Sequence, residues 1–507
     1  MNIDDIKKYY DQAKKENQDF APMMNRIYQF IQNYNTNWGT SNGNIINKGG
    51  RTDTKIYATN IAQYCDEFAN YLTNLVFPYG VKFFNLAYED LDNSEQQNKE
   101  TIYKTSETLF KYLENSNFYQ EVPKAFKDLV AGTGALLMNY NVINKSIYFK
   151  ALDVSKLYFL EDDFSIPNYV FRDIGTISHL DRLRTYPNIN FSTDKDLTLI
   201  EYVIPMNENN KIKFKYVLTD DGFKTEYFVR IWDTNPFIIF RWSTDSNENI
   251  GRGILCKHLT TCNLIDELEQ SILKGTEMAL NPVLVTNDNT FAENNHGFDF
   301  RSGSIIQIGY QSTIQQLPNN VNLPFARADI NEKYQEIINS LHIRPLSEQQ
   351  REMTATEVQA RLSQQINILG GFANRHIREL VIPIINRTIE LLTVANVLDK
   401  NSTKNHKIIY ENPITKLNNQ IEIQGTINAL QYLNMVGGNQ GQVMINSTIM
   451  RGKVSEKIME ASGLDPSYYN NADVIEKNLE HIEQAQQIQQ YLQLQASNPN
   501  LQSNGGM

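Results

Sequence analysis

ILCKHLTTCNLIDELEQSILKGTEMALNP, residues 254–282, is the stretch of sequence that decides the fold. Apolar side chains recur through it at near-heptad spacing, which predicts an amphipathic helix; they are Leu255, Leu259, Cys262, Ile265, Leu268 and Ile272. At 1.5 Å of rise per residue, a helix over residues 254–280 is about 40 Å long. Asn281 and Pro282 end it, because proline cannot continue a helix.

A second amphipathic helix follows after an insertion with few charges. The insertion contains strand-like runs of β-branched residues at 283–288 and 304–309. Asp329 and Glu332 have the spacing of a capping box, so we expect the second helix to span residues 329–343. Two helices that leave a body and return to it, with a small β module between them, predict a stalk.

A polar loop, RPLSEQQREM at residues 344–353, leads from the second helix to a third. Another capping box at 354–357 opens this third helix, which we expect to run to about Leu398. Gly370-Gly371 and Pro383 should bend it. Judged from spacing alone, the polar loop is a solvated connection between helices.

The rest of the chain is helical at both ends and β-rich between them. Helices are expected at residues 1–36, 54–76, 98–115, 119–131 and 476–495. Short β-branched and aromatic runs between Gly134 and Trp242, separated by turn residues, predict an antiparallel β region. The fold class is therefore mixed α+β, and the composition after Ser497 is typical of a disordered tail.

Composition limits the possible functions. A chain of 507 residues exceeds what one hydrophobic core usually supports, so we expect several domains or an elongated subunit. Lys and Arg number 47 against 58 Asp and Glu, a net charge of −11, which argues against a protein that grips nucleic acid but not against one through which DNA passes. Three cysteines without a CxxC pair argue against a disulfide framework. We see neither a signal peptide nor the roughly 20 apolar residues that a membrane-spanning helix needs.

The motifs that could carry enzymatic chemistry are incomplete. The glycines of 132–134 lack the Gly-Lys-Ser/Thr of a phosphate-binding loop, and those of 251–253 lack the third glycine of a dinucleotide fingerprint, so turns are favoured at both places. Glu161-Asp162-Asp163 could pair carboxylates around a metal, but no partner motif accompanies them and a solvated turn is favoured. The seven histidines lack metal-ligand spacing. We therefore expect no catalytic residue, no metal site and no cofactor.

A set of short strings occurs in a recognisable order. They are LVFPYGVKFFNL (75–86), the segment 118–138 with its GTGALL core, the segment 235–255 from NPFIIFRW to NIGRGIL, NPV (281–283), SGSI (302–305), and MTATEVQAR (353–361) with the later LGG and IPIINR. Together they resemble the portal (head-to-tail connector) proteins of podovirus-type tailed bacteriophages, and MTATEV before a long helix is the most specific string. The chain departs from the family at Gly370-Gly371, where Gly-Pro is common, and carries little resemblance after about residue 400.

The resemblance implies an elongated portal-type subunit that closes into a ring, usually a dodecamer, around a DNA channel. Its parts would be a wing, a two-helix stem, a small β clip, a long kinked helix and a helical C-terminal crown. The implied regions are 1–253 (wing), 254–280 (first stem helix), 281–328 (clip), 329–343 (second stem helix), 344–354 (channel or tunnel loop), 355–398 (kinked wing helix), 399–470 (wing or crown base) and 471–507 (crown helix and disordered tail).

The implied function is structural and not enzymatic. The ring would conduct viral double-stranded DNA during packaging and ejection, without reading its sequence. It would dock the terminase large subunit, later a tail adaptor protein, and the major capsid and scaffolding proteins. The subunit would lie at the portal vertex of the virion, and in the host cytoplasm during assembly, without contact to a membrane.

The resemblance also turns the polar loop into the candidate DNA-channel site, through Arg344, Gln349, Gln350 and Arg351. One arginine per subunit, repeated around a ring, gives a band of positive charge that contacts phosphates and not bases. Two alternatives remain open on the sequence alone. One is another virion head-tail adaptor or core protein, and the other is a metal-dependent nuclease built on the acidic pair at Asp162 and Asp163.

Overall fold

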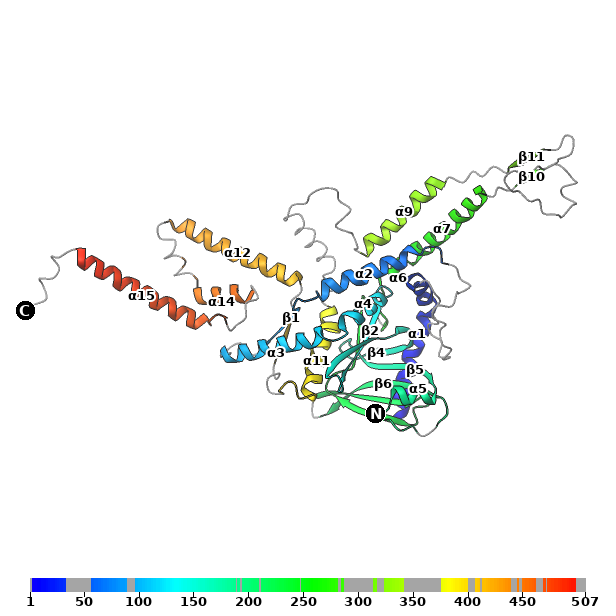
Figure 1. Cartoon of the computed structure of the whole chain (residues 1–507), viewed down its shortest axis with the longest axis horizontal. Coiled ribbons are helices and arrows are strands. Elements are labelled where there is room, and N and C mark those ends of the chain that lie inside the picture. Colours follow the sequence, from blue (N-terminus) through cyan, green and yellow to red (C-terminus); the bar gives the residue numbers. More distant parts are fainter. Residues whose placement is uncertain are drawn as a thin grey trace, which may run out of the picture.

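The computed structural model describes most of the chain, and its elements are shown in Figure 1. The described residues are 2–32, 56–88, 96–187, 189–191, 194–208, 211–246, 248–280, 284–286, 313–316, 323–341, 375–399, 406–410, 413–438, 445, 449–461, 468–470 and 472–497. Helices and antiparallel sheets both contribute, so the predicted mixed α+β class is confirmed. A compact body carries a two-helix arm on one side and a group of helices from the C-terminal part on the other.

The body contains the N-terminal helices and nearly all of the strands. Its helices are α1 (Ile3–Gln32), α2 (Asn60–Val76), α3 (Gln96–Glu114), α4 (Phe118–Leu129) and α5 (His179–Thr185). Its strands are β1 (Phe84–Tyr88), β2 (Thr133–Asn141), β3 (Ser146–Ala151), β4 (Leu157–Glu161), β5 (Pro167–Ile177), β6 (Leu197–Glu208), β7 (Lys211–Asp220), β8 (Glu226–Trp232) and β9 (Phe237–Arg241). The helices and the β region expected in this half are confirmed; α5 was not predicted.

Two antiparallel sheets form the β part of the body. One has the order β3-β2-β9, and the other has the order β4-β5-β6-β7-β8. All five residues of β9 are buried, because this strand lies between the helices and the second sheet and has no solvent face. Its continuous apolar run in the sequence reflects that position.

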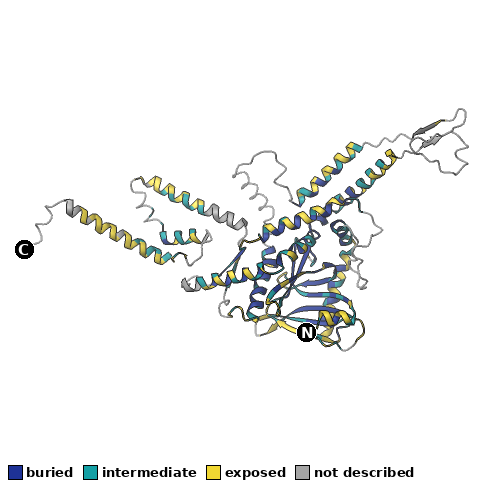
Figure 2. Ribbon diagram, viewed as in Figure 1, coloured by how far each residue is buried: buried dark blue, intermediate teal, exposed yellow. Residues whose placement is uncertain are grey.

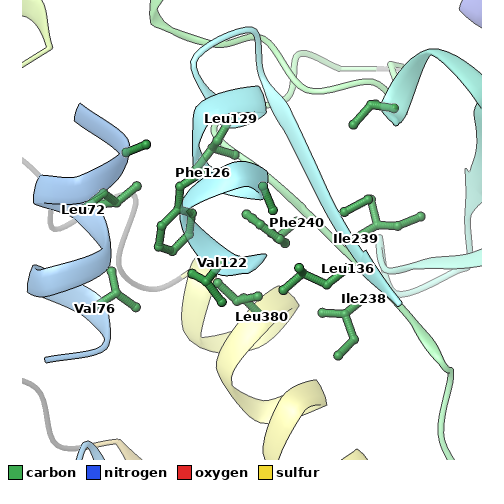
Figure 3. Close-up of a cluster of buried hydrophobic side chains, with 14 of the residues drawn as sticks. Leu72, Val76, Val122, Phe126, Leu129, Leu136, Ile238, Ile239, Phe240 and Leu380 are labelled. Atoms are coloured by element: carbon green, nitrogen blue, oxygen red, sulfur yellow. The ribbon is translucent and has the colours of Figure 1, made fainter. Parts of the chain in front are cut away.

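The main core lies where α4 packs between α2 and the three-stranded sheet. In Figure 3, Val122, Phe126 and Leu129 of α4 lie between side chains of α2 on one side and those of β2 and β9 on the other. The second sheet has its own smaller cluster, in which Tyr10 of α1 meets the rings of Tyr158, Phe171 and Phe223 edge-on. Since the first half of α1 belongs to this cluster and its second half to the main core, α1 joins the two.

The arm consists of α7 (Leu259–Leu280) and the returning α9 (Leu323–Ser340). α6 (Ile254–Lys257) precedes it, and a short antiparallel pair, β10 (Leu284–Thr286) with β11 (Ile314–Gln316), lies between its two helices. The predicted arrangement of two helices with a β module between them is confirmed (Figure 1). The predicted helix over 254–280 is interrupted at His258. The predicted strand at 304–309 lies outside the described residues.

The start of the second arm helix was predicted wrongly. It begins at Leu323 and not at Asp329, so Asp329 and Glu332 lie inside the helix and do not cap it. Pro324 is tolerated there because the N–H groups of a first helical turn have no partner within the helix. The cap-like spacing of Asp329 and Glu332 was therefore misleading.

The helix that returns to the body is irregular near Pro383, where the sequence predicts a bend. A π turn, η4 (Ile377–Val381), leads directly into α11 (Ile382–Val394). Proline has no N–H to donate to the preceding turn, and a wider π turn is a common way to accommodate such a defect. Gly370-Gly371 and the capping box at 354–357 lie outside the described residues.

The C-terminal part consists of β12 (His406–Tyr410), α12 (Pro413–Gly437), α14 (Arg451–Ala461) and α15 (Ala472–Ser497). β12 pairs antiparallel with β1 of the body. The predicted helix at 476–495 is confirmed by α15, while the tail expected to be disordered lies outside the described residues. The described side chains of α12 and α15 are mostly exposed and those of α14 mostly intermediate (Figure 2), so these helices have little core of their own.

Candidate functional site: a two-helix arm and its root

The predicted DNA-channel residues, Arg344, Gln349, Gln350 and Arg351, lie outside the residues that the structure describes. The description ends at Leu341 and resumes at Arg375, so the role of these four residues stays a prediction. The part of the chain that leads into them is the arm, which we define as α7 together with α9. Its packing, its surface and its root can be described residue by residue.

The two arm helices pack through one apolar side of α9. Ile330, Tyr334 and Ile337 are buried at this contact. The Tyr334 hydroxyl donates to Glu269 of α7 at 3.3 Å, and its ring meets Tyr64 of α2 edge-on. The half of α9 that contains Tyr334 is therefore attached both to α7 and to α2 of the body.

The outer half of the arm exposes large apolar side chains. Leu273, Met278 and Leu280 of α7 are 56%, 52% and 76% exposed, and Phe325 of α9 is 71% exposed. Figure 2 shows the arm as a mixture of buried and exposed positions along its length. Exposed apolar groups at this density on a projecting element are typical of a protein–protein interface.

The charge of the arm is predominantly negative. Apart from Asp266, which is buried and paired with Arg26, six carboxylates stand against three cations, which are Lys274, Arg327 and Lys333; the carboxylates are Glu267, Glu269, Glu277, Asp329, Glu332 and Glu336. Such a surface repels phosphate. The arm by itself is therefore suited to DNA that passes and not to DNA that is held.

Asp266 anchors the root of the arm. Its carboxylate pairs with Arg26 of α1 at 3.1 Å and accepts the backbone N–H groups of Tyr57 and Ala58 at 2.7 and 3.1 Å. Arg26 also donates to Asn263 of α7 at 2.7 Å. Because hydrogen bonds to ionised groups are stronger than neutral ones, this cluster ties α7 to α1 and to the segment before α2.

The glycines of 132–134 and 251–253 pack against each other beside the root. Gly132 has a φ of +137°, and a Cβ atom on Gly132, Gly251 or Gly253 would collide with the backbone of the facing segment. The Gly253 N–H donates to Ala131 O at 3.0 Å, and the Gly251 N–H donates to the Thr133 hydroxyl at 2.9 Å. The motif at 132–134 is therefore the predicted turn between helix and strand, whereas residues 251–253 do not form the predicted turn and Gly253 is extended. The glycines of both motifs allow two backbones to cross in contact.

The acidic triplet at 161–163 shapes a turn. Asp162 accepts the N–H groups of Phe164 and Ile166 at 2.9 and 3.0 Å, whereas Asp163 is exposed. Glu161 forms an ion pair with Arg241. The prediction of a turn is thus supported, and Glu161 in addition pairs with a buried arginine of the body.

Arg241 links the returning helix to both sheets. Its guanidinium is buried and pairs with Glu379 of the π turn at 2.7 Å, with Glu161 of β4, and with the carbonyl of Asn249 at 3.0 Å. Burial opposes the positive charge, but the hydrogen bonds that the guanidinium donates to Glu379 and Glu161 outweigh it and hold the pKa of Arg241 above its usual value. This network fixes where the helix that follows the polar loop enters the body.

A second buried arginine holds the other end of that helix. Arg387 of α11 stacks on Trp232 with 4.0 Å to the ring centre, and Arg230 stacks on the same ring at 3.7 Å. Burial lowers the pKa of Arg387 to about 10, although Glu390, which pairs with it at 2.8 Å, acts in the opposite direction. The end of β8 is thereby attached to α11.

The sequence contained a signal for two of these anchors, which sequence reasoning missed. Asp266 stands next to Ile265 on the otherwise apolar face of its helix, and Arg241 is the one charge in the strand FIIFR. Burying a charge inside an apolar run costs free energy unless the charge is paired, so each of these residues indicates a buried ion pair. The partners, Arg26 and Glu379, lie too far along the chain to be identified by spacing.

No three His, Cys, Asp or Glu side chains in the described part of the chain lie close enough together to hold a metal ion. No helix among the described residues is long and apolar enough to cross a membrane.

Comparison with known proteins gives one informative result. No curated protein matches the chain. A family model described as bacteriophage head to tail connecting protein matches residues 4–469. The match spans the body, the arm and most of the C-terminal part, and so covers well over half of the sequence. The chain therefore belongs to the family of bacteriophage head-to-tail connecting proteins.

Proposed function

We propose that this chain is the subunit of a closed ring, a dodecamer by resemblance, at the portal vertex of a phage capsid. The ring conducts viral DNA during packaging and ejection and has no enzymatic activity of its own. Membership in a structural family at the phage head–tail junction supports this proposal. In it, the body is the wing, the arm is the stem, β10 and β11 belong to the clip, and the C-terminal helices form the crown.

The observation that carries the proposal is the incompletely covered arm. Leu273, Leu280 and Phe325 are too exposed for an isolated subunit, and neighbouring copies in a ring would cover them. The negative surface of the arm would then line a channel along which DNA moves without adhering. The polar loop would supply a band of contacts through Arg344, Gln349, Gln350 and Arg351.

The partners follow from the same arrangement. The tip of the arm would dock the terminase large subunit and later the tail adaptor, and the body would contact the major capsid and scaffolding proteins. ATP hydrolysis would belong to the terminase, since no complete nucleotide-binding motif occurs in this sequence.

Electron microscopy of the purified chain tests the proposal. We expect negatively stained particles with rotational symmetry and a central hole, and a mass of many subunits by light scattering. A stable monomer at micromolar concentration, without ring particles, would exclude the proposed ring. If rings form only after a tail protein is added, the chain would be a head-tail adaptor and not a portal subunit.

A further inference from the structure

β8 is one edge of the five-stranded sheet, and no other strand among the described residues pairs with its outer side. Other edges are closed by side chains: Asn117 bonds both the N–H and the carbonyl of Phe149 in β3, and Glu379 accepts the N–H of Arg241 in β9. Among the described residues no comparable bond reaches the outer side of β8. An open edge is a template for pairing with another chain, and folded proteins usually protect it.

The open edge is also apolar on both faces. Val229 and Ile231, on one face, are 44% and 48% exposed, and Phe228, on the other, is 37% exposed. Ile212 of the neighbouring strand adds a further exposed group. Since apolar exposure on an edge strand promotes association, this strand has the composition of an interface.

The charge beside this edge is mainly positive. Lys211, at the start of β7, is exposed and forms no ion pair with another described residue, whereas Arg230 of β8 is exposed but stacks on Trp232. The other lysines of β7 are neutralised, Lys213 by Glu208 and Lys215 by Glu226. Asp233, just after β8, offsets part of the remaining charge, so the edge keeps a small positive excess.

The opposite edge of the same sheet, at β4, carries an exposed negative charge that is complementary to the positive charge near β8. There the turn between β4 and β5 presents Asp163, which is exposed and unpaired among the described residues, and Phe164, whose side chain is 64% exposed. Arg378 is close to this turn, but it donates to the carbonyl oxygen of Phe164 and not to Asp163. This edge is therefore acidic with one prominent apolar group.

Both features lie at the same end of the sheet. The strands alternate in direction, so the turn after Glu161, the start of β7 at Lys211 and the last residue of β8, Trp232, share one end. Four strand spacings separate the two edges, about 19 Å. One copy therefore presents a basic, apolar edge on one flank and an acidic turn with an exposed phenylalanine on the other.

We propose that β8 of one copy docks against the β4–β5 turn of the next copy. The contact joins different surfaces of the two copies, so repetition produces a ring or a helix and not a closed pair. Lys211 meets Asp163, and Phe164 covers the apolar side chains of β8. This inference rests on the proposed ring, and it assigns the acidic triplet, which the fold uses only in part, to subunit contact.

A charge-swap cycle on the full-length chain tests the contact. Asp163→Lys and Lys211→Glu change exposed side chains, so both variants should fold. Each alone should raise the concentration for half assembly, measured by mass photometry, by about tenfold or more, because like charges then face each other. The double variant should return it to within about threefold of the unmodified protein.

Matched controls separate this contact from general effects of charge. Lys224→Glu makes the same change at the far end of the β7–β8 hairpin, and Val142→Lys places a lysine on a different hairpin as the counterpart of Val229→Lys. Both controls should assemble normally, whereas Val229→Lys should not. If the unmodified chain forms rings but the single variants assemble equally well, or the double variant is no better than either, this contact is excluded while the ring stands. If the unmodified chain does not assemble, the proposed function itself fails.

Discussion

Arg26 in α1 and Asp266 in α7, 240 positions apart in the chain, form an ion pair with 3.1 Å between Nη2 and Oδ2 at the point where the arm leaves the body. The same carboxylate accepts two backbone N–H groups from the segment that precedes α2. The direction of the arm thus depends on one side chain that three separate segments share.

Removing the Asp266 carboxylate should weaken this root. Asp266→Ala leaves the N–H groups of Tyr57 and Ala58 without their acceptor and removes the charged partner of Arg26, which keeps its bond to Asn263. Because Arg26 is about one-third exposed, we expect a loss of about 2–3 kcal/mol in the free energy of unfolding, less than for a fully buried pair. Urea denaturation measures it, with Lys104→Ala in an exposed ion pair as the control, for which less than about 1 kcal/mol is expected. Equal effects in the two variants would contradict the assigned role of Asp266.

Arg241 and Glu379 should behave as a strongly coupled pair. Glu379→Ala removes the main partner of a buried guanidinium and should cost about 3–5 kcal/mol. The double variant Arg241→Met/Glu379→Leu removes both charges, so we expect it to be more stable than Glu379→Ala alone. Thermal and urea unfolding of the set would show the coupling. Additive losses would mean that the two residues act independently.

The contact between the backbones at Gly132 and Gly251 should tolerate no side chain at either position. Gly132→Ala combines a φ of +137° with a collision against the Gly251 backbone, and we expect a loss of about 3 kcal/mol or more. Gly425→Ala is the matched control, because this glycine lies in α12 with open space around its Cβ position. Alanine should stabilise α12 there by up to about 1 kcal/mol. Yields of folded protein and melting temperatures distinguish the two outcomes.

The stability of the body should depend on pH through Asp128. Burial, and next the charge of Asp153, raise the pKa of Asp128 from its ordinary value of 3.8 to about 8. The folded chain therefore holds a proton that the unfolded chain has lost, and this group's contribution to stability falls as pH rises from about 4 to about 8. The slope is at most about 1.4 kcal/mol per pH unit. Asp128→Asn should flatten the stability profile between pH 5 and 8; an unchanged profile would show that Asp128 is ionised in the folded chain.

The polar loop gives a test at the level of the virus. If the loop lines the channel, Arg351→Glu repeats a negative charge in every subunit and should leave ring assembly intact while shortening the packaged genome. Genome length per capsid is the measurement. Lys224→Glu is a control with the same sign of charge on the β7–β8 hairpin. Full-length genomes at normal yield in the Arg351→Glu variant would show that this side chain does not contact DNA in a way that matters.

The sequence alone determined the elements whose signals lie close to them in the chain. The apolar period of 254–280, the stop at Asn281-Pro282 and the capping and turn residues of the body lie within a few positions of the structure that they specify. The helical arm with its β module, the antiparallel region and the C-terminal helix follow from them. One local signal that failed, the capping-box spacing at Asp329 and Glu332, failed because a helix can begin earlier wherever its first turn is tolerated.

Only the tertiary structure decided the relationships between distant segments. The pairing of β1 with β12, the crossing of Gly132 over Gly251 and the bond from Arg26 to Asp266 join residues separated by more than a hundred positions. A spacing rule cannot find such partners, because the position of each depends on how every element between them packs. The sequence marks Asp266 and Arg241 as charges in need of a partner, but the free energy that selects the partner exists only once the core has formed.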